Sequence, residues 1–139
     1  MARRIPWSIS TTVRNPYRIV DFLRVLAASL DGAVWDRSSQ SLYQMHLIKN
    51  RLYGLDNAEF RNNIPEDLYL KFADVEHDIS LDDVKLIVAA KNYQDFPMRG
   101  RTSFSPLREF GLVNINSNGK IEITSSGKFL LNEGPYDEF

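Results

Sequence analysis

The sequence predicts an α+β fold that is mostly helical. Apolar residues recur every three or four positions in several segments, which is the spacing of one face of a helix. Two short alternating segments flank the pair Asn118-Gly119 near the C-terminus, a pattern typical of a β-hairpin. The length of 139 residues fits one ordinary domain, or two small subdomains that share a core.

The chain opens with a segment that predicts an N-terminal strand or arm. "WSISTTV", residues 7–13, alternates and is rich in β-branched residues, so we expect a short strand there. Asn15-Pro16 then begins a helix, because asparagine caps helices well and proline is tolerated in the first turn. Apolar residues at helical spacing follow, and Gly32 provides the stop.

Two more helices are expected before residue 80. One begins at Asp36 or Ser38 and runs to Tyr53, where Gly54 ends it. The other begins after Pro65, where two acidic residues suit the positive end of a helix dipole.

From residue 80 onwards the signals for element boundaries are clearer. "SLDD" at 80–83 predicts a capping box in which Asp83 takes the place of the usual glutamate, at the start of a helix that ends near Asn92. "YQDFPMRGR", residues 93–101, is expected to be a connection, because it contains Pro97 and Gly100.

A short helix, a hairpin and a final helix follow this connection. Thr102 or Ser103 can cap the short helix, which Gly111 ends. Residues 112–115 face 121–123 in the hairpin, and Thr124 caps the last helix.

Helix, connection, short helix, hairpin and helix is the order of a winged helix-turn-helix. In such folds the second of the two helices enters the major groove of DNA and the hairpin lies along the phosphate backbone. We therefore divide the chain into an N-terminal arm and helical part (1–79), a winged helix (80–132) and the start of a linker (133–139). A winged helix that binds only other proteins, or one that resembles a transcription regulator and has no nuclease context, remains an alternative, because a fold does not settle a function.

Composition excludes several classes of protein. There are no cysteines, so disulfide scaffolds and thiolate metal sites are ruled out. No apolar run reaches the ~18 residues of a membrane span, and the N-terminus lacks the apolar core of a signal peptide. We expect a cytoplasmic protein without a membrane partner.

Charge is segregated along a chain whose net charge is only -1. Residues 1–24 hold five arginines and one aspartate, residues 56–95 hold ten acids and four basic residues, and residues 99–128 hold five basic residues and two acids. A basic surface can therefore exist on a nearly neutral protein. Solvated faces without any partner are the alternative.

The basic and polar residues around the short helix and the hairpin are the predicted contacts to double-stranded DNA. Arginine suits bidentate contact to guanine or a clamp on phosphate, and small hydroxyls or amides suit phosphates. The predicted DNA-binding residues are Arg99, Arg101, Ser103, Ser105, Arg108, Asn118 and Lys120, with Arg3, Arg4 and Arg14 of the N-terminal arm.

Several of these assignments have alternatives. Ser103 can serve only as a helix cap. Glu109 can accept from a cytosine amine or remain a solvated or arginine-paired acid. The arm can enter a minor groove or make no contact. Trp7 and Trp35 are more often core residues than platforms for bases.

No catalytic residue is predicted. The one carboxylate group, Asp78 with Asp83 and Lys85, falls at a helix start, where acids serve capping and the dipole. His46 and His77 are far apart in sequence, and His46 lies among apolar residues of a helix. We expect no metal or other cofactor in this chain.

Three segments resemble the AlwI family of type IIS restriction endonucleases, which includes nicking relatives. They are "WSISTTVRNPYRIVDFLRVL" at the start, "LYQMHLIKNRLYG" in the second helix, and "SPLREFGLVNINSNGKIEITSSGKFL" near the end. The last is similar to the end of the first recognition subdomain of that family, and more loosely to the matching subdomain of FokI. The acidic middle of the chain matches weakly.

The resemblance implies a sequence-specific DNA-recognition module from a longer enzyme of restriction-modification. Further recognition and nuclease domains of the same polypeptide would be its partners, and Mg²⁺ would act in the nuclease domain. On this basis we expect Phe139 to be an artificial or proteolytic end.

Overall fold

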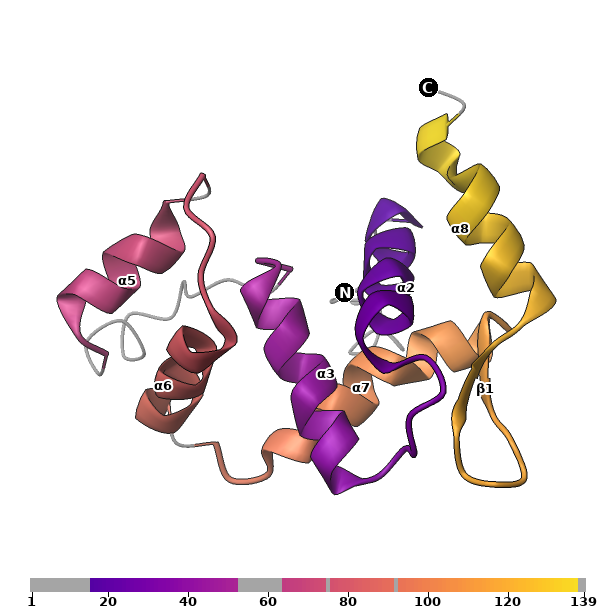
Figure 1. Cartoon of the computed structure of the whole chain (residues 1–139), viewed down its shortest axis with the longest axis horizontal. Helices are drawn as coiled ribbons and strands as arrows, with labels where there is room; N and C mark the ends of the chain where they lie inside the picture. The colour runs from indigo at the N-terminus through magenta and orange to yellow at the C-terminus, as the bar shows by residue number, and fades with distance from the viewer. Residues whose placement is uncertain (1–15, 53–63, 75, 92, 138–139) are drawn as a thin grey trace, which may run out of the picture.

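The computed structural model describes residues 16–52, 64–74, 76–91 and 93–137. Within these ranges the fold is mostly helical with one small antiparallel sheet, as the sequence predicts (Figure 1). The elements in chain order are α2 (Pro16–Leu30), α3 (Arg37–Lys49), α5 (Glu66–Ala73), α6 (Leu81–Lys91), α7 (Phe96–Glu109), β1 (Val113–Ile115), β2 (Ile121–Ile123) and α8 (Ser125–Asp137). The strand expected over 7–13 lies outside the described residues.

Three helix starts, those of α3, α6 and α8, follow the predicted capping chemistry. The Asp36 side chain accepts a hydrogen bond from the Ser39 N–H at 2.9 Å, and the Ser39 hydroxyl accepts from the Asp36 N–H at 2.9 Å. At α6, Asp83 donates its N–H to the Ser80 hydroxyl at 3.0 Å, while its carboxylate accepts from the Ser80 N–H at 3.3 Å. Thr124 accepts from the Gly127 N–H at 3.0 Å and so caps α8. All three caps are local, which is why they could be predicted.

The end of α3 differs from the prediction. The helix ends at Lys49, with Asn50 as its C-cap, rather than at Tyr53. The Arg51 N–H donates to the Ile48 carbonyl and the Leu52 N–H donates to the Leu47 carbonyl, both at 2.9 Å, which closes a Schellman motif. Arg51 takes the left-handed position of that motif, with φ 58°, where glycine is usual.

The largest correction concerns residues 93–101. We expected a connection there, but α7 begins at Phe96 and runs through both Pro97 and Gly100. Asp95 caps it by accepting from the Met98 N–H at 3.4 Å, and Pro97 falls in the first turn, where a missing N–H costs nothing. The helix ends at Glu109, and Gly111 provides the predicted stop in a second Schellman motif, with φ +75° at that glycine.

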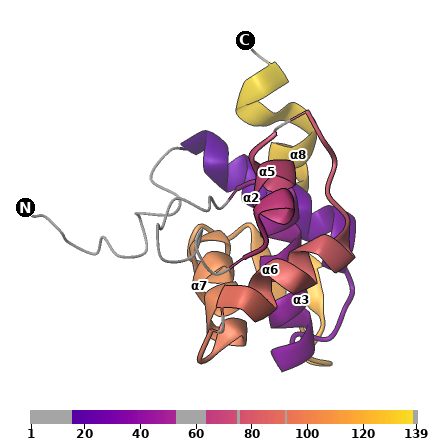
Figure 2. The same ribbon diagram turned by 90° about the vertical axis from the view of Figure 1, so that its left-hand side faces the viewer.

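Two apolar cores meet along α3. The first joins α2, α3, α7 and the hairpin, and its buried residues include Phe22, Tyr43 and Leu107. The second joins α5, α6 and Ile48 of α3, with Phe72 and Ile87 among its members. The α5–α6 part lies at one end of the molecule and the hairpin with α8 at the other, while α3 and α7 run between them (Figure 1). In the end-on view of Figure 2, α5 and α6 are nearest to the viewer.

The helix that packs most extensively on α7 is α3. The sequence interpretation paired α7 with α6, its predecessor in the chain, but Val84 and Ile87 of α6 belong to the second core. Trp35 of the connection between α2 and α3 stacks on Phe104 with ring centroids 4.2 Å apart, so this tryptophan packs against the core. Residues far apart in sequence therefore build the centre of the fold.

The hairpin has the predicted strands and the predicted turn, over residues 116–119. Val113 pairs with Ile123 and Ile115 with Ile121, and the Gly119 N–H donates to the Asn116 carbonyl at 2.9 Å. Of the turn residues, Gly119 has positive φ (76°) and Asn118 does not, as in hairpin loops that end on a left-handed glycine.

The connection between α2 and α3 binds the edge of this hairpin. Val34 forms an isolated antiparallel bridge with Lys120. The Trp35 N–H donates to the Gly119 carbonyl at 2.8 Å and the Ile121 N–H donates to the Ala33 carbonyl at 2.8 Å. The hairpin is thus held by backbone hydrogen bonds to a segment near the start of the described chain.

Candidate nucleic-acid interface

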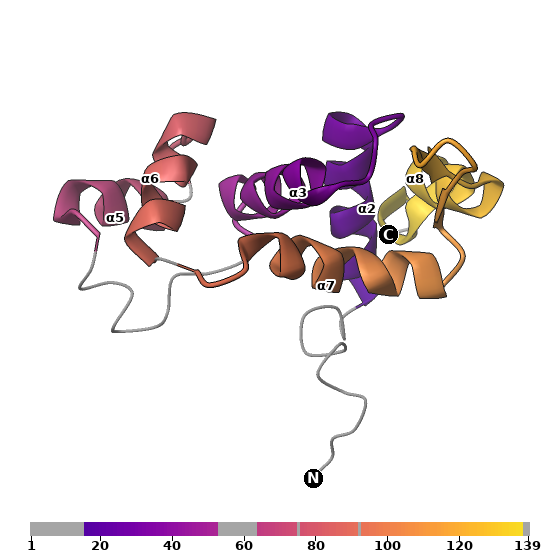
Figure 3. The same ribbon diagram turned by 90° about the horizontal axis from the view of Figure 1, so that it is seen from below.

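Helix α7 has one buried face and one exposed face. Gly100, Phe104 and Leu107 point to the core, whereas Met98, Thr102 and Glu109 are exposed. Seen from below, α7 runs along one side of the molecule from the α6 end to the hairpin (Figure 3). The hairpin follows α7 directly in the chain.

Close contact with α3 holds α7 in place. A Cβ atom on Gly100 would lie 2.0 Å from the backbone carbonyl oxygen of Gln40, so only glycine allows the two backbones to approach this far. Deeper in the same interface the Ser103 hydroxyl donates to the Gln44 side-chain oxygen at 2.9 Å. Both residues are almost fully buried.

Ser103 is therefore removed from the predicted contacts to DNA. Its hydroxyl bonds Gln44 and the Arg99 carbonyl within the fold and cannot reach a phosphate, so that prediction is wrong. The capping alternative is wrong as well, because α7 already begins at Phe96. Ser105 is partly exposed, and its hydroxyl donates to the Arg101 carbonyl at 3.0 Å.

Arg101 is a partly exposed cation with two acceptors. One terminal nitrogen donates to the Gln40 side-chain oxygen at 2.9 Å, and the other lies 3.5 Å from a carboxylate oxygen of Asp95. The second carboxylate oxygen of Asp95 lies 3.5 Å from Arg37. This cluster of two arginines and one aspartate keeps a net positive charge.

Arg99 and Arg108 occupy different sides of the exposed surface of α7. The guanidinium of Arg99 lies over the ring of Tyr93, 5.3 Å from its centroid, in a cation–π contact. Arg108 follows Arg101 by seven positions and Ser105 by three, so these three residues form one stripe along the helix. Arg108 is exposed.

At the hairpin turn, the side chain of Asn116 organises the backbone. It accepts hydrogen bonds from the Asn118 N–H at 2.9 Å and from the Lys120 N–H at 3.1 Å. The side chains of Asn118 and Lys120 are exposed. The turn therefore presents one amide and one cation on a loop held by internal hydrogen bonds. Arg3, Arg4, Arg14 and Trp7 lie outside the described residues.

Sequence reasoning missed four residues of this surface. Met98 and Thr102 lie on the exposed face, and Gln40 and Asp95 hold Arg101. Aspartate is a common helix N-cap and proline is tolerated in the first turn, so Asp95 followed by Pro97 could have revealed the true start of α7. No local signal could have found Gln40, which is 61 positions from Arg101.

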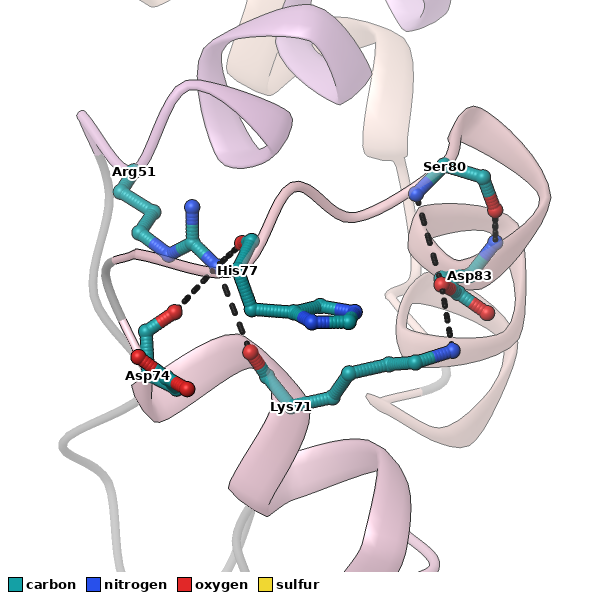
Figure 4. Close-up of polar contacts among 6 residues, drawn as sticks. All are labelled: Arg51, Lys71, Asp74, His77, Ser80 and Asp83. Atoms are coloured by element: carbon teal, nitrogen blue, oxygen red, sulfur yellow. Dashed lines mark hydrogen bonds and ion pairs between the residues drawn. The ribbon is translucent and has the colours of Figure 1, made fainter.

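Of the two carboxylates considered for catalysis, Asp78 is exposed and Asp83 has structural partners (Figure 4). Asp83 accepts from the Lys71 ammonium at 3.2 Å as well as from Ser80, and the Lys71 hydrogen bond is the main cause of its lowered pKa. Nearby, Arg51 donates to the carbonyls of Phe72 and Asp74 at 2.8 and 2.9 Å and also to that of His77. These contacts join the end of α3 to α5 and the start of α6.

A cleft of about 450 Å³ lies between α2 and α3, with Asp21, Arg24, His46 and Asn50 among its lining residues. Partial burial, with a smaller contribution from the positive charge of Lys49, lowers the pKa of His46. The side chain of His46 is partly buried.

Within the described ranges, no group of three or more His, Asp or Glu side chains is placed to hold a metal ion. In the same part of the chain, every helix is too short or too polar to cross a membrane. Comparison of the chain with family models, with curated proteins and with solved structures finds no match in any of the three.

Proposed function

We propose that this chain recognises double-stranded DNA in a sequence-specific manner, with α7 in the major groove. The observation that carries the proposal is the stripe of Arg101, Ser105 and Arg108, which is partly to fully exposed on α7, together with the exposed Lys120 at the turn of the hairpin that follows this helix. Cations beside small polar side chains suit phosphates and the acceptor edge of guanine.

The proposed architecture is a winged helix-turn-helix made of α2, α3, α7, the hairpin and α8. In this proposal α3 and α7 are the two helices of the motif, and residues 50–95 replace the short turn between them. The bridge between Val34 and Lys120 supports it, because it holds the hairpin beside the helices as a wing.

The position of the acidic residues is compatible with a DNA-facing α7. Many of the exposed acidic residues lie on α5 and α6 and not on α7. Asp95, which precedes α7, is paired with Arg37 and Arg101. Glu109 is exposed on α7, where it can accept a hydrogen bond from a cytosine amine.

The parent protein that we propose is a type IIS restriction or nicking endonuclease. This part of the proposal rests on the three segments that resemble the AlwI family. The nuclease domain and its Mg²⁺ would then belong to other parts of the polypeptide. We expect the chain itself to bind DNA without cutting it when Mg²⁺ or Mn²⁺ is supplied.

A protein-binding winged helix is the second candidate, and two exposed aromatic residues favour it. Phe110 is 64% exposed and Phe129 is 67% exposed. Large apolar side chains on a surface often mark protein contacts. In that case the arginines of α7 would be dispensable for binding and these phenylalanines would not.

Selection of bound duplexes from a random-sequence library tests the proposal. The wild-type chain should enrich one short sequence, and replacing Arg99, Arg101 and Arg108 by alanine should abolish the enrichment. A matched control replaces Lys49, Lys85 and Lys91, which removes the same charge from α3 and α6, and it should keep the enrichment. No enrichment by the wild type, or equal enrichment by the triple arginine variant, would contradict the assignment.

A further inference from the structure

Arg101 differs from the other arginines of α7 because side chains from two other parts of the chain hold it. Gln40, which is 7% exposed, comes from α3, and Asp95 precedes α7. The Gln40 oxygen accepts at 2.9 Å and an Asp95 oxygen lies at 3.5 Å, on different terminal nitrogens of the guanidinium. Two fixed acceptors on two nitrogens restrict both the position and the plane of the group.

The held guanidinium still has hydrogen-bonding capacity. Arginine carries five N–H donors, and these two contacts use one on each terminal nitrogen. The side chain is 42% exposed and lies on the outward stripe with Ser105 and Arg108. Among the described residues, the Arg108 side chain has no hydrogen bond or ion pair, so its guanidinium is not oriented in this way.

The orientation of a guanidinium matters more for contact with a guanine base than for contact with a phosphate. A phosphate accepts hydrogen bonds from many directions, so a mobile cation serves it well. The N7 and O6 acceptors of guanine lie in one plane at a fixed spacing, and they require a guanidinium in that plane. A side chain that is already ordered also loses less freedom on binding.

We propose that Gln40 and Asp95 are positioning residues that orient Arg101 to read one guanine in the major groove. The inference rests on the proposed function, and it predicts that the recognised DNA sequence contains a guanine. Arg108 and Lys120 then contact phosphates. Gln40 does not touch the DNA and acts through Arg101.

The test uses the whole chain and the duplex selected by the wild type. Each guanine of that duplex is replaced in turn by 7-deazaguanine, which lacks the N7 acceptor, and binding is measured by fluorescence anisotropy. We expect one position to matter, and Arg101→Ala to abolish the roughly 10- to 100-fold preference there. Binding to unrelated duplexes should change much less.

Gln40→Met removes the acceptor and keeps the size of the side chain, so it should lower the preference at the same position by about 3- to 10-fold. Gln40→Met should have no further effect on base preference when Arg101 is already alanine. Gln40→Glu, which has a side-chain acceptor again, should recover the preference for guanine. Gln44→Met is the matched control, because Gln44 lies in the same interface and bonds Ser103 instead. It should leave the preference unchanged.

Three results would overturn the inference. The first is that Arg101→Ala weakens binding to all duplexes equally, and that Arg101→Lys, which keeps the charge but lacks the forked guanidinium, does the same. The second is that Gln40→Met and Gln44→Met lower the base preference by the same factor, which would show that Gln40 has a purely structural role. A wild-type chain that prefers no sequence would overturn the proposed function too, whereas the first two results would leave it standing. Thermal unfolding of each variant checks that it is folded.

Discussion

Gly100 of α7 lies against the backbone of Gln40 of α3, at a point where a Cβ atom would be 2.0 Å from a carbonyl oxygen. The helices therefore cross with backbone on backbone. An obstacle made of backbone cannot rotate away as a flexible side chain can, so this contact has a strong consequence for substitution.

Gly100→Ala should destabilise the protein by about 3 kcal/mol or more, because the added methyl group forces α3 and α7 apart. Helix propensity alone predicts the opposite sign, since alanine is favoured over glycine by about 1 kcal/mol inside a helix. Urea unfolding measures the difference. Thr102→Ala, on the exposed face, is the control and should stay within about 0.5 kcal/mol of the wild type. A stabilised Gly100→Ala variant would show that the helices do not meet as described.

Arg51 combines an unfavourable backbone conformation with a favourable side chain. Arg51→Gly should lose the hydrogen bonds to the end of α5, at a cost of roughly 1.5–3 kcal/mol. Arg51→Ala should be worse by a further ~1–2 kcal/mol, because alanine keeps the cost of the left-handed φ. Equal stability of the two variants would mean that the positive φ is not maintained. Amide exchange should locate the loss in α5 and the start of α6.

The contact between Lys71 and Asp83 should make stability depend on pH at the acidic end. The folded pKa of Asp83 is lowered, so the ionised carboxylate contributes stability at neutral pH, and this contribution is lost as pH falls through the folded pKa. Asp83→Asn should therefore lower the melting temperature at pH 7, and its difference from the wild type should shrink as pH falls below about 4. Glu76→Gln, at an exposed carboxyl, should show little difference at either pH.

If Lys120 contacts phosphate, Lys120→Ala should weaken binding to all duplexes alike. A chain with about four well-placed cations should show a log–log salt slope on the order of −3 to −4, and this variant should be shallower by about one unit. Titrations at several salt concentrations measure the slope. Lys85→Ala, at the α6 end, should leave it unchanged, and an equal change in both variants would indicate general attraction without a defined face.

The extent to which the sequence predicts this structure depends on the range of the interactions. The capping box at the start of α6, the stop at Gly111 and the two facing strands of the hairpin were predicted correctly because neighbouring residues determine them. The start of α7 was missed because Gly100 was interpreted as a helix breaker. Its true role, close approach to Gln40, involves a partner 60 positions away that no local pattern reveals.

In the candidate site, too, local features could be predicted from the sequence and contacts between distant residues could not. Arg101, Ser105 and Arg108 could be selected from residue type, but Arg101 was expected in the connection before the helix, whereas all three lie in one stripe of α7. Ser103 was misplaced because the helical register was taken from the wrong starting residue. The buried partner of Ser103, Gln44, and the holder of Arg101, Gln40, both come from α3, so they emerge only when α3 and α7 are packed together.

The pairing of α3 with α7 also has a consequence for the order of folding. These helices can meet only after the chain between them, residues 50–95, has closed into a loop, and contacts of such long sequence separation slow folding. The cost of closing a loop rises with the number of disordered residues in it. Since part of this loop has an apolar core of its own, early formation of α5 and α6 would shorten the effective loop and so speed the docking of the two helices.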